Sequence, residues 1–235
     1  MWVIAEYEAT SLFTLKPASA TSSGGRTLLV PTPFAIKMAI LDVAIRSEGV
    51  DIADEMMEWL SSVQVAIEPP THVVVNNTFM RVLRPRRRAA SEGSADAGPF
   101  QRTIAYREYA QLDNFKIAVD VPDTEVNEMR HYLTYINYLG KRGSFMQIQR
   151  IPKQQDDLPD SFIKIGEAIN GFDMDSVMTQ LDDTAEDVTF TQVNIYSSGR
   201  GSTLRLGKHR ILRHVALPYR LVRSSRGYSY YELSR

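Results

Sequence analysis

Apolar positions in the first quarter of the chain predict one strand followed by two helices. Residues 2–9 mix apolar and polar side chains as a strand does, whereas residues 33–47 repeat apolar side chains at helical spacing. Thr32 is a good N-cap and Pro33 suits the first helical position, so the start of this helix is well marked. The second helix is expected over residues 52–61.

The middle of the chain predicts a long hairpin between shorter extended segments. Extended runs are expected at residues 63–67, 72–75, 78–83, 106–109 and 115–121. The segment between the two arms, residues 85–99, is rich in arginine, small residues and glycine. The stretch from about 70 to 110 therefore predicts a hairpin with a basic, disordered end.

Capping signals predict a third helix that begins at Asp123 or Thr124 and ends at Gly140, with a strand over 145–151 after it. Beyond this strand the pattern weakens. The remaining expectations are a short helix near 174–181, a strand at 188–196, and two extended runs within 203–223 that are broken by Gly207 and Pro218.

The element order is strand, helix, strands, helix, strand, which is the β-α-β-β-α-β order of a ferredoxin-like fold. We therefore expect an α+β protein. Residues 1–151 form a ferredoxin-like, RNA-recognition-like domain with the hairpin at about 70–110, and residues 152–235 form a smaller β-rich lobe.

Composition removes several classes of site. The 235 residues include no cysteine, which excludes disulfides, cysteine-ligated zinc and cysteine nucleophiles. The four histidines form no metal-spaced cluster, so we expect no metal and no cofactor. The chain has neither a membrane-length apolar run nor a signal-peptide pattern, and a cytoplasmic protein is the natural expectation.

The net charge of −1 hides a strong local asymmetry. Residues 156–187 carry ten acidic side chains and one base, whereas residues 200–226 carry eight bases and no acid. Residues 81–107 hold seven arginines against two acids. Because local charge sets the field that a phosphate chain meets, nucleic-acid binding stays open.

The loop before the first helix is a candidate phosphate site. Gly24 and Gly25 let a backbone approach a phosphate closely, Arg26 follows them, and a helix N-terminus offers free N–H groups to an anion. Lys37 would lie one turn into the helix, beside that end. The alternative is a flexible surface loop before an ordinary helix, and the pattern alone favours it.

The hairpin is the second candidate, because arginine forks pair with phosphates and stack on bases. Its candidate contacts are Arg84, Arg86, Arg87, Arg88, Arg102 and Arg107. Tyr106 and Tyr109 add aromatic faces. The alternative is a solvated loop whose charges serve solubility.

The third candidate is the turn Gly140–Ser144, in which two glycines surround Lys141 and Arg142, and Ser144 offers a hydroxyl. A helix C-cap with dipole-compensating bases explains the first three residues equally well.

The fourth candidate is a strand near the C-terminus that alternates basic and apolar residues. Its basic face comprises Arg205, Lys208, Arg210 and Arg213. This face either follows an RNA backbone or pairs with the acidic 156–187 segment of the same chain. His209, with Tyr196, is the one arrangement that suggests acid–base RNA cleavage, and a phosphate contact is the commoner role for such a histidine.

Several blocks resemble the CRISPR-associated Cas-five family, of the RAMP superfamily, whose members serve in Cascade-type effector complexes. The blocks are GGRTLLVPTPFAIKMAILDVAIR, TIAYREYAQLDNFKIAVDV, TYINYLGKRGSF and LRHVALPYRLV. The resemblance covers most of the chain and is weakest over residues 152–195. It implies a ferredoxin-like domain with a protruding hairpin, the thumb, and a small C-terminal β domain.

The resemblance also implies a function in antiviral defence or guided transposition. Such a chain grips the 5′ handle of the CRISPR RNA (crRNA) and contacts the backbone subunit of the Cas-seven family and the large subunit of the Cas-eight family. Target DNA is met only indirectly. The phosphate-cradling loop carries over to Gly25, Arg26, Thr32 and Lys37, the thumb to about 70–110, and the glycine turn to Gly140–Ser144.

One branch of this family cleaves precursor RNA with a tyrosine and an adjacent lysine–histidine pair in the middle of the chain. The only such pair here is Lys208–His209, near the C-terminus. We therefore expect a non-catalytic binder, with metal-independent repeat cleavage as the alternative. A third alternative is an unrelated interaction protein whose basic strand pairs with its own acidic segment.

Overall fold

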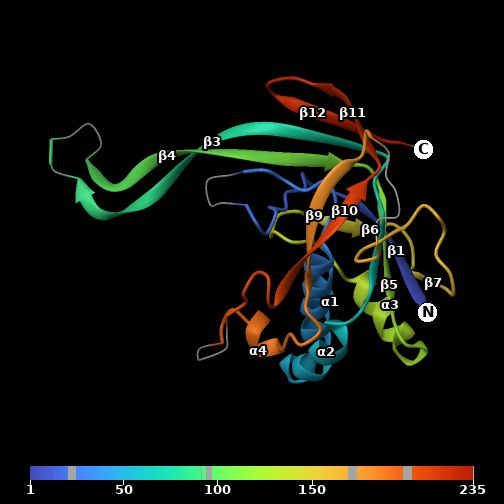
Figure 1. The fold of residues 1–235 in the computed structure, drawn as a ribbon. Coiled ribbons are helices and arrows are strands. Elements are labelled where there is room, and N and C mark those ends of the chain that lie inside the picture. Colours follow the sequence, from blue (N-terminus) through green and yellow to red (C-terminus); the bar gives the residue numbers. More distant parts are fainter. Residues whose placement is uncertain (21–24, 91, 94–96, 169–173, 198–202, 235) are drawn as a thin grey trace.

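The structure is a computed structural model that describes residues 1–20, 25–90, 92–93, 97–168, 174–197 and 203–234. Gly24 and parts of the hairpin tip, of the 18–25 loop and of the acidic segment lie outside these residues. Figure 1 shows a compact body of helices and strands from which one long hairpin projects.

The first sheet forms the centre of the body and has the strand order β6-β1-β5-β2-β8, with β7 also paired to β1. Every pairing in it is antiparallel. Its strands are β1 (Trp2–Ala9), β2 (Val65–Glu68), β5 (Phe115–Asp120), β6 (Met146–Ile148), β7 (Lys153–Gln155) and β8 (Ile163–Lys164).

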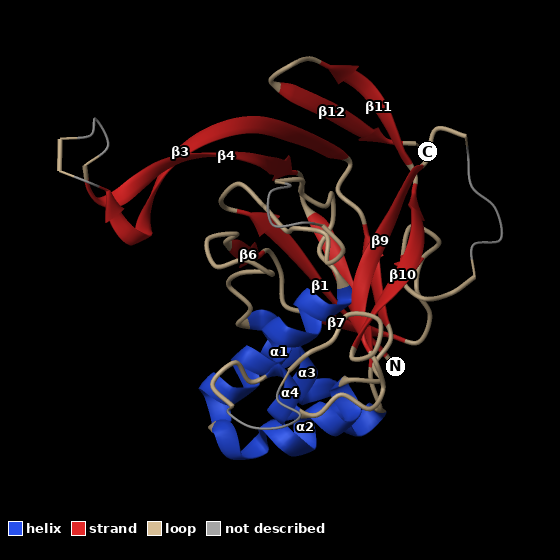
Figure 2. Ribbon diagram, turned by 60° about the vertical axis from the view of Figure 1, so that its left-hand side comes forward, coloured by secondary structure: helices blue, strands red, loops and turns tan. Residues whose placement is uncertain are grey.

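Helices cover one face of this sheet (Figure 2). They are α1 (Pro33–Glu48), α2 (Ala53–Leu60), α3 (Val126–Thr134) and α4 (Phe190–Val193), with 3₁₀ turns at Val50–Ile52 and Asp123–Glu125. Alternate residues of β1, including Val3 and Tyr7, enter the same core as Ile36 and Ile40 of α1. The opposite face buries Trp2, over which Leu158 and Phe162 pack.

The second sheet carries the projecting hairpin and has the order β11-β12-β3-β4. Its strands are β3 (His72–Ala90), β4 (Gly98–Leu112), β11 (Tyr219–Ser224) and β12 (Tyr228–Leu233). The inner ends of the hairpin are anchored, because Val73, Val75 and Ala110 are buried in the main core. The outer parts leave the body (Figure 1). They bear exposed apolar and basic side chains.

A separate pair of strands, β9 (Val177–Thr184) and β10 (Arg210–Leu217), packs beside α1. The two strands pair antiparallel along their whole length. β9 comes from the acidic segment and β10 from the basic one, so the fold joins the two oppositely charged stretches of the sequence.

The expected strand at 2–9, helices at 33–47 and 52–61, hairpin, and extended runs around Pro218 all correspond to observed elements. The third helix is shorter than predicted: α3 ends at Thr134, six positions before Gly140. Residues 137–139 instead pair with the strand that follows, since Asn137 accepts from Met146 N at 2.9 Å and Leu139 N donates to Ser144 O at 3.2 Å. Gly140, at φ 74°, therefore belongs to a tight turn.

Two expectations in the weakly patterned region were wrong. The helix near 174–181 is instead strand β9, whose pairing with β10 along eight residues outweighs the local pattern. The strand expected at 188–196 is not formed: residues 190–193 are instead the helical turn α4, which begins at a capping box of Thr189 and Gln192.

Strands from residues 152–235 join both of the larger sheets. β7 and β8 extend the first sheet, and β12 pairs with β3 of the second. Leu181, Val215 and Tyr219 belong to the same buried cluster as Val3. The molecule is thus a mixed α and β fold built on antiparallel sheets. None of the helices within the described ranges is long and apolar enough to cross a membrane.

Candidate nucleic-acid interface

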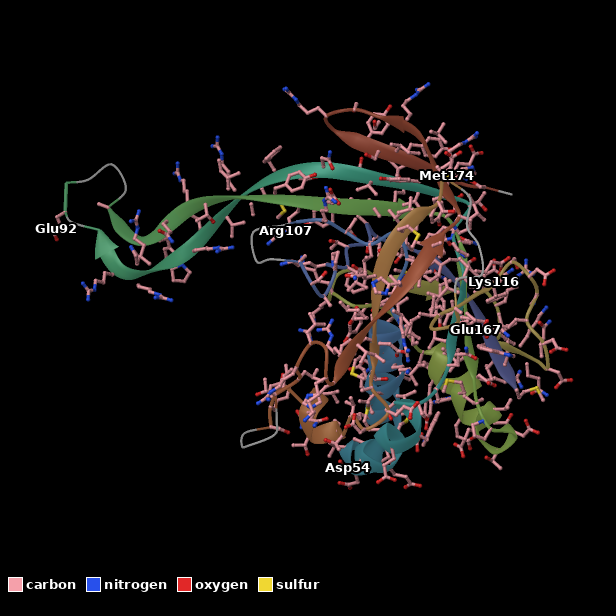
Figure 3. The ribbon with its side chains drawn as sticks, in the orientation of Figure 1. Asp54, Glu92, Arg107, Lys116, Glu167 and Met174 are labelled. Carbon is pink, nitrogen blue, oxygen red and sulfur yellow. The ribbon has the colours of Figure 1, made fainter. Side chains whose placement is uncertain are left out.

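Four basic side chains from distant parts of the sequence converge where the hairpin leaves the body. Lys16, Arg26, Arg107 and Lys141 line an open hollow of about 360 Å³, together with Thr14, Leu15 and Gly25. We call this the basic cradle. Figure 3 labels Arg107 at the root of the hairpin, far from Glu92 at its tip. Sequence alone had indicated three of these bases as parts of separate motifs, and the fold brings them together.

The cradle depends on a close approach of Gly25 to the edge of β4. The Gly25 carbonyl accepts from Glu108 N at 2.7 Å, and a Cβ at Gly25 would lie 1.9 Å from the Tyr106 carbonyl oxygen. No side chain fits at that distance, so only glycine allows the loop to pack here. The close backbone contact that Gly25 makes is with a strand edge within the chain, and its expected approach to a phosphate stays a prediction.

A second segment, residues 13–15, closes the cradle from below. Phe13 and Ala110 exchange two backbone hydrogen bonds of 2.7 and 2.8 Å, which adds a short extension to the free edge of β4. Leu28 N donates to the Leu15 carbonyl at 2.8 Å and ties the same segment to the chain after Arg26. These bonds place Lys16, an exposed base that no sequence pattern had indicated, on the rim.

The Glu108 carboxylate, next to Arg107 in sequence, is engaged by internal donors. Glu108 accepts from Thr27 N at 3.0 Å and from the Tyr106 hydroxyl at 3.0 Å. Burial, reinforced by Glu108, raises the pKa of Tyr106, which keeps its phenol neutral and donating. Glu108 keeps its negative charge, but the four bases that line the cradle outnumber it, so the cradle has a net positive charge toward an approaching phosphate.

The glycine turn contributes bases but not its serine. Lys141 and Arg142 are exposed, whereas Ser144 is buried. Ser144 Oγ accepts from Thr14 N at 3.1 Å, so it fixes the 13–15 segment instead of facing a ligand. The prediction of Ser144 as an RNA contact was wrong for this reason.

Two residues expected beside the helix start are also internal. Thr32 is 1% exposed and caps α1 through Ala35 N at 3.2 Å, which confirms the predicted cap and corrects the predicted RNA contact. Lys37 is 1% exposed, and its ammonium donates to Asp183 Oδ1 at 2.8 Å. Its other acceptors are the Ser61 carbonyl and Thr184 Oγ1, both at 2.9 Å. The expectation that Lys37 contacts phosphate was therefore wrong.

Burial is the main influence on Lys37 and lowers the pKa of its ammonium, while the nearby Asp183 carboxylate opposes this shift. The local sequence placed Lys37 correctly one turn into α1. What it did not show is that β9 covers that turn and supplies the acid.

The basic strand divides into internal and exposed parts. Arg210 Nε donates to Asp182 at 3.0 Å, and Arg213 Nε lies 3.7 Å from Asp183. These two arginines follow the alternative in which the basic strand pairs with the acidic segment, while their side chains stay 31% and 39% exposed. Their role as RNA contacts stays a prediction. Arg205 and Lys208 are exposed in the turn before β10.

His209 is 5% exposed, not on an open basic strand as expected, and its Nδ1 accepts from Arg205 N at 3.2 Å. Tyr196, its suggested partner for cleavage chemistry, is 89% exposed. Burial of the histidine separates it from any RNA lying on the surface.

The outer hairpin combines exposed bases with exposed apolar rings. Arg84, Arg87, Arg88 and Arg102 are exposed, and Arg86 Nε donates to the Phe100 carbonyl at 3.1 Å. The large apolar side chains Phe79, Leu83, Phe100 and Ile104 are all more than half exposed. Tyr106, expected as a stacking face, instead packs on Phe79 with ring centres 5.4 Å apart. These apolar residues were not predicted as part of the interface, although the alternation of side chains along β3 and β4 can be seen in the sequence.

No protein-family model matches this chain. A CRISPR-associated protein Cas5 of Archaeoglobus fulgidus is 22% identical over 220 residues, which cover 90% of this chain and 92% of that protein.

A solved structure described as a CRISPR RNA-guided surveillance complex contains a chain with the same fold. Its TM-score is 0.50 at 15% identity, over 92% of this chain and 90% of the other. A crystal structure of a CRISPR protein from Archaeoglobus fulgidus reaches 0.46 at 13% identity, over 100% and 92% of the two chains. The sequence similarity to the CRISPR-associated protein Cas5 of Archaeoglobus fulgidus spans nearly the full length of both chains, so this chain is similar to a Cas5 protein throughout.

Proposed function

We propose that this protein is a non-catalytic, cytoplasmic subunit of a CRISPR RNA-guided surveillance complex of the Cascade type. In this role it binds the 5′ handle of the crRNA and caps the filament of backbone subunits. It thereby supports target DNA recognition in antiviral defence or guided transposition. The similarity to a Cas5 protein and the fold shared with a chain of a surveillance complex support this proposal.

The observation that carries the proposal is the basic cradle. Four bases from four separate segments meet at one hollow whose neighbouring carboxylate is already engaged. An RNA phosphate satisfies such a group of cations, and arginine adds a bidentate geometry that suits phosphate oxygens. A surface that only provided solubility would not gather its bases around a backbone-lined hollow.

The proposed function assigns a role to the core sheet and to the hairpin. The four strands in the order β6-β1-β5-β2, with α1 and α3 as crossovers, support a ferredoxin-like core of the RAMP type. We assign the β3–β4 hairpin as the thumb. Its exposed apolar and basic side chains suit contact with RNA and with a neighbouring backbone subunit of the Cas-seven family. The large subunit of the Cas-eight family is the second proposed partner.

The assignment as a non-catalytic binder rests on the surroundings of the Lys208–His209 pair. His209 is buried and bonded to the backbone within its own turn. A general acid or base must come within hydrogen-bond reach of its substrate. The proposed function is therefore RNA retention through contacts to the phosphates and to unstacked bases.

The test is RNA binding by the full chain across a series of salt concentrations. The probe is a labelled 5′-handle RNA of the associated CRISPR repeat. The double variant Arg26→Ala, Lys141→Ala should lower the slope of log K against log [salt] by about 1.4, since each contact to single-stranded RNA contributes roughly 0.7. A matched double variant, Arg150→Ala with Lys153→Ala, removes two exposed bases that do not line the cradle and should leave the slope unchanged. Equal slopes for all three proteins would contradict the proposal.

A further inference from the structure

A second hollow lies directly beside the basic cradle. It has a volume of about 210 Å³ and lies over the N-terminus of α1. The side chains that line it and carry the argument below are Leu15, Phe34, Met38, Tyr138, Asp182 and Arg210. Leu15 lines both hollows, and Gly140 and Lys141, which are adjacent in sequence, line one each. A ligand bound in the cradle therefore lies next to this second hollow.

The walls of the hollow suit a flat ring. Phe34 and Tyr138 are only partly buried, so each offers ring surface that no other part of the protein covers. The Arg210 guanidinium lies 4.3 Å from the centre of the Phe34 ring. Planar nucleobases stack on aromatic rings and on guanidinium planes. The volume is below the roughly 300–1,000 Å³ of pockets for drug-sized molecules, so the hollow suits a fragment such as a single base.

The polar end of the hollow is a nearly buried carboxylate. Asp182 is 2% exposed, and both donors of Arg210 that reach it bond to Oδ2. Among the residues that the structure describes, no hydrogen bond uses Asp182 Oδ1. A carboxylate oxygen that receives no hydrogen bond within the protein can accept one from a ligand.

The carboxylate distinguishes between bases. An ionised carboxylate only accepts hydrogen bonds, so its partner must present N–H groups. On its Watson–Crick edge, guanine presents two adjacent N–H donors, at N1 and N2. Adenine and cytosine each present one amino group beside an acceptor, and uracil presents one N–H between two acceptors. Only guanine offers a pair of donors without an adjacent acceptor facing the carboxylate.

We propose that this hollow receives one unstacked guanine base of the RNA strand whose phosphates lie in the basic cradle. This inference rests on the proposed RNA-binding function and adds a base preference to it. The guanine Watson–Crick edge faces Asp182, and its ring stacks against Phe34 and Tyr138. The cradle supplies affinity regardless of sequence, and the hollow selects one nucleotide.

The test measures binding of the full chain to nine-residue oligouridylates with one central substitution. The four probes carry guanosine, inosine, adenosine or uridine at that position. Inosine lacks only the N2 amino group of guanosine. We expect guanosine to bind roughly five-fold or more tightly than each of the others, the lower end of the discrimination given by a good bidentate base contact.

Two variants locate the preference. Phe34→Ala removes a partly buried ring, and Asp182→Asn replaces one of the two acceptor oxygens with a donor while keeping the shape. Each should bring the four probes to within about two-fold of one another, while the salt slope stays that of the unmodified chain. Because Asp182→Asn also weakens the contact to Arg210, its thermal unfolding is measured in parallel, and Phe34→Ala serves as the variant that leaves this contact in place.

The outcomes separate this inference from the proposed function. Tight, salt-dependent and cradle-dependent binding with equal affinity for all four probes would overturn the guanine site alone. A guanosine preference that survives in Phe34→Ala would also overturn it. Absence of RNA binding by the unmodified chain would overturn both.

Discussion

The outer hairpin and strand β10 are both rich in arginine, but the structure uses these arginines in opposite ways. On the hairpin, Arg87, Arg88 and Arg102 extend into solvent. On β10, Arg210 and Arg213 face Asp182 and Asp183 across the β9–β10 pair. The difference lies in the neighbouring strand, because β4 brings few acids to the hairpin whereas β9 brings two adjacent aspartates to β10.

The comparison shows that a basic run stays exposed to solvent where the neighbouring strand supplies few acids, and is paired internally where that strand supplies several. Lys37 is the extreme case, since it begins in a region that suits phosphate binding and ends buried against Asp183. A charged group that is removed from water must be paired. The acidic segment that lowers the net charge of the chain is thus, in part, a set of internal counterions.

The largest expected effect concerns the internal ion pair between Lys37 and Asp183. Lys37→Ala leaves Asp183 with one fewer partner in a buried site, and loss of one member of a buried pair costs about 3–5 kcal/mol. The free energy of unfolding, measured in urea, should fall by that amount. Lys208→Ala, an exposed base in the turn before β10, is the matched control and should change it by less than about 0.5 kcal/mol. Equal stabilities for the two variants would show that Lys37 is not an internal counterion.

The next largest effect concerns the arginines of the outer hairpin. Replacing Arg86, Arg87 and Arg88 with alanine should lower the salt slope of handle-RNA binding by about 2, since three contacts to a single strand are lost. Unfolding should be almost unchanged. The control is the triple variant Arg220→Ala, Arg223→Ala, Arg226→Ala, which removes the same charge from β11 and its turn. If both triple variants lower the slope equally, net charge and not the hairpin governs binding.

A smaller effect tests how the root of the hairpin is held. Tyr219 is buried, and its hydroxyl donates to the Pro70 carbonyl at 2.7 Å, next to the start of β3. Burial raises the pKa of Tyr219 well above its ordinary value of 10.0. Its neutral form therefore stabilises the fold fully below pH 10, and this contribution is lost above pH 10 by about 1.4 kcal/mol per pH unit.

Tyr219→Phe isolates that contribution. The phenylalanine variant should be less stable at pH 8, by about 1 kcal/mol for the lost hydrogen bond. Between pH 10 and 11 the difference between the two proteins should shrink or reverse, since only the tyrosine protein has a phenol to ionise on unfolding. A constant difference across this interval would argue against a raised pKa.

The smallest effect concerns a surface ion pair. Arg220 lies 3.5 Å from Glu232 across β11 and β12, and both side chains are substantially exposed. Arg220→Ala should change the free energy of unfolding by no more than about 1 kcal/mol, because exposed pairs gain little in water. A cost comparable to that of Lys37→Ala would mean that exposure does not separate the two regions.

The sequence predicted the elements that carry their own local signals. Thr32 and Pro33 mark the start of α1, and the extended runs on the two sides of Pro218 are strands β10 and β11. The expectations failed where pairing across the molecule outweighed local preference. β9 is a strand because β10 pairs with it. α3 ends early because the chain after it pairs with the next strand, where Met146 N donates to the Asn137 carbonyl. Neither partner is visible within a local window of sequence.

The candidate site divides in the same way. Arg26, Arg107 and Lys141 were predicted because each stands in a glycine-rich or arginine-rich motif. Lys16 was not, because only the bridge between Phe13 and Ala110 brings its segment to the cradle. Thr32 and Ser144 were misassigned since their hydroxyls satisfy backbone donors within the chain.

The route of the chain between the two sheets has a consequence for folding during synthesis. β3 is made well before β12, its partner at the root of the hairpin. Until β12 emerges from the ribosome, β3 presents one unpaired edge with Val73 and Val75 beside it, the kind of edge that invites aggregation. Native pairing of β3 must therefore wait for the synthesis of β12. The long sequence separation between these strands adds loop-closure entropy and slows folding.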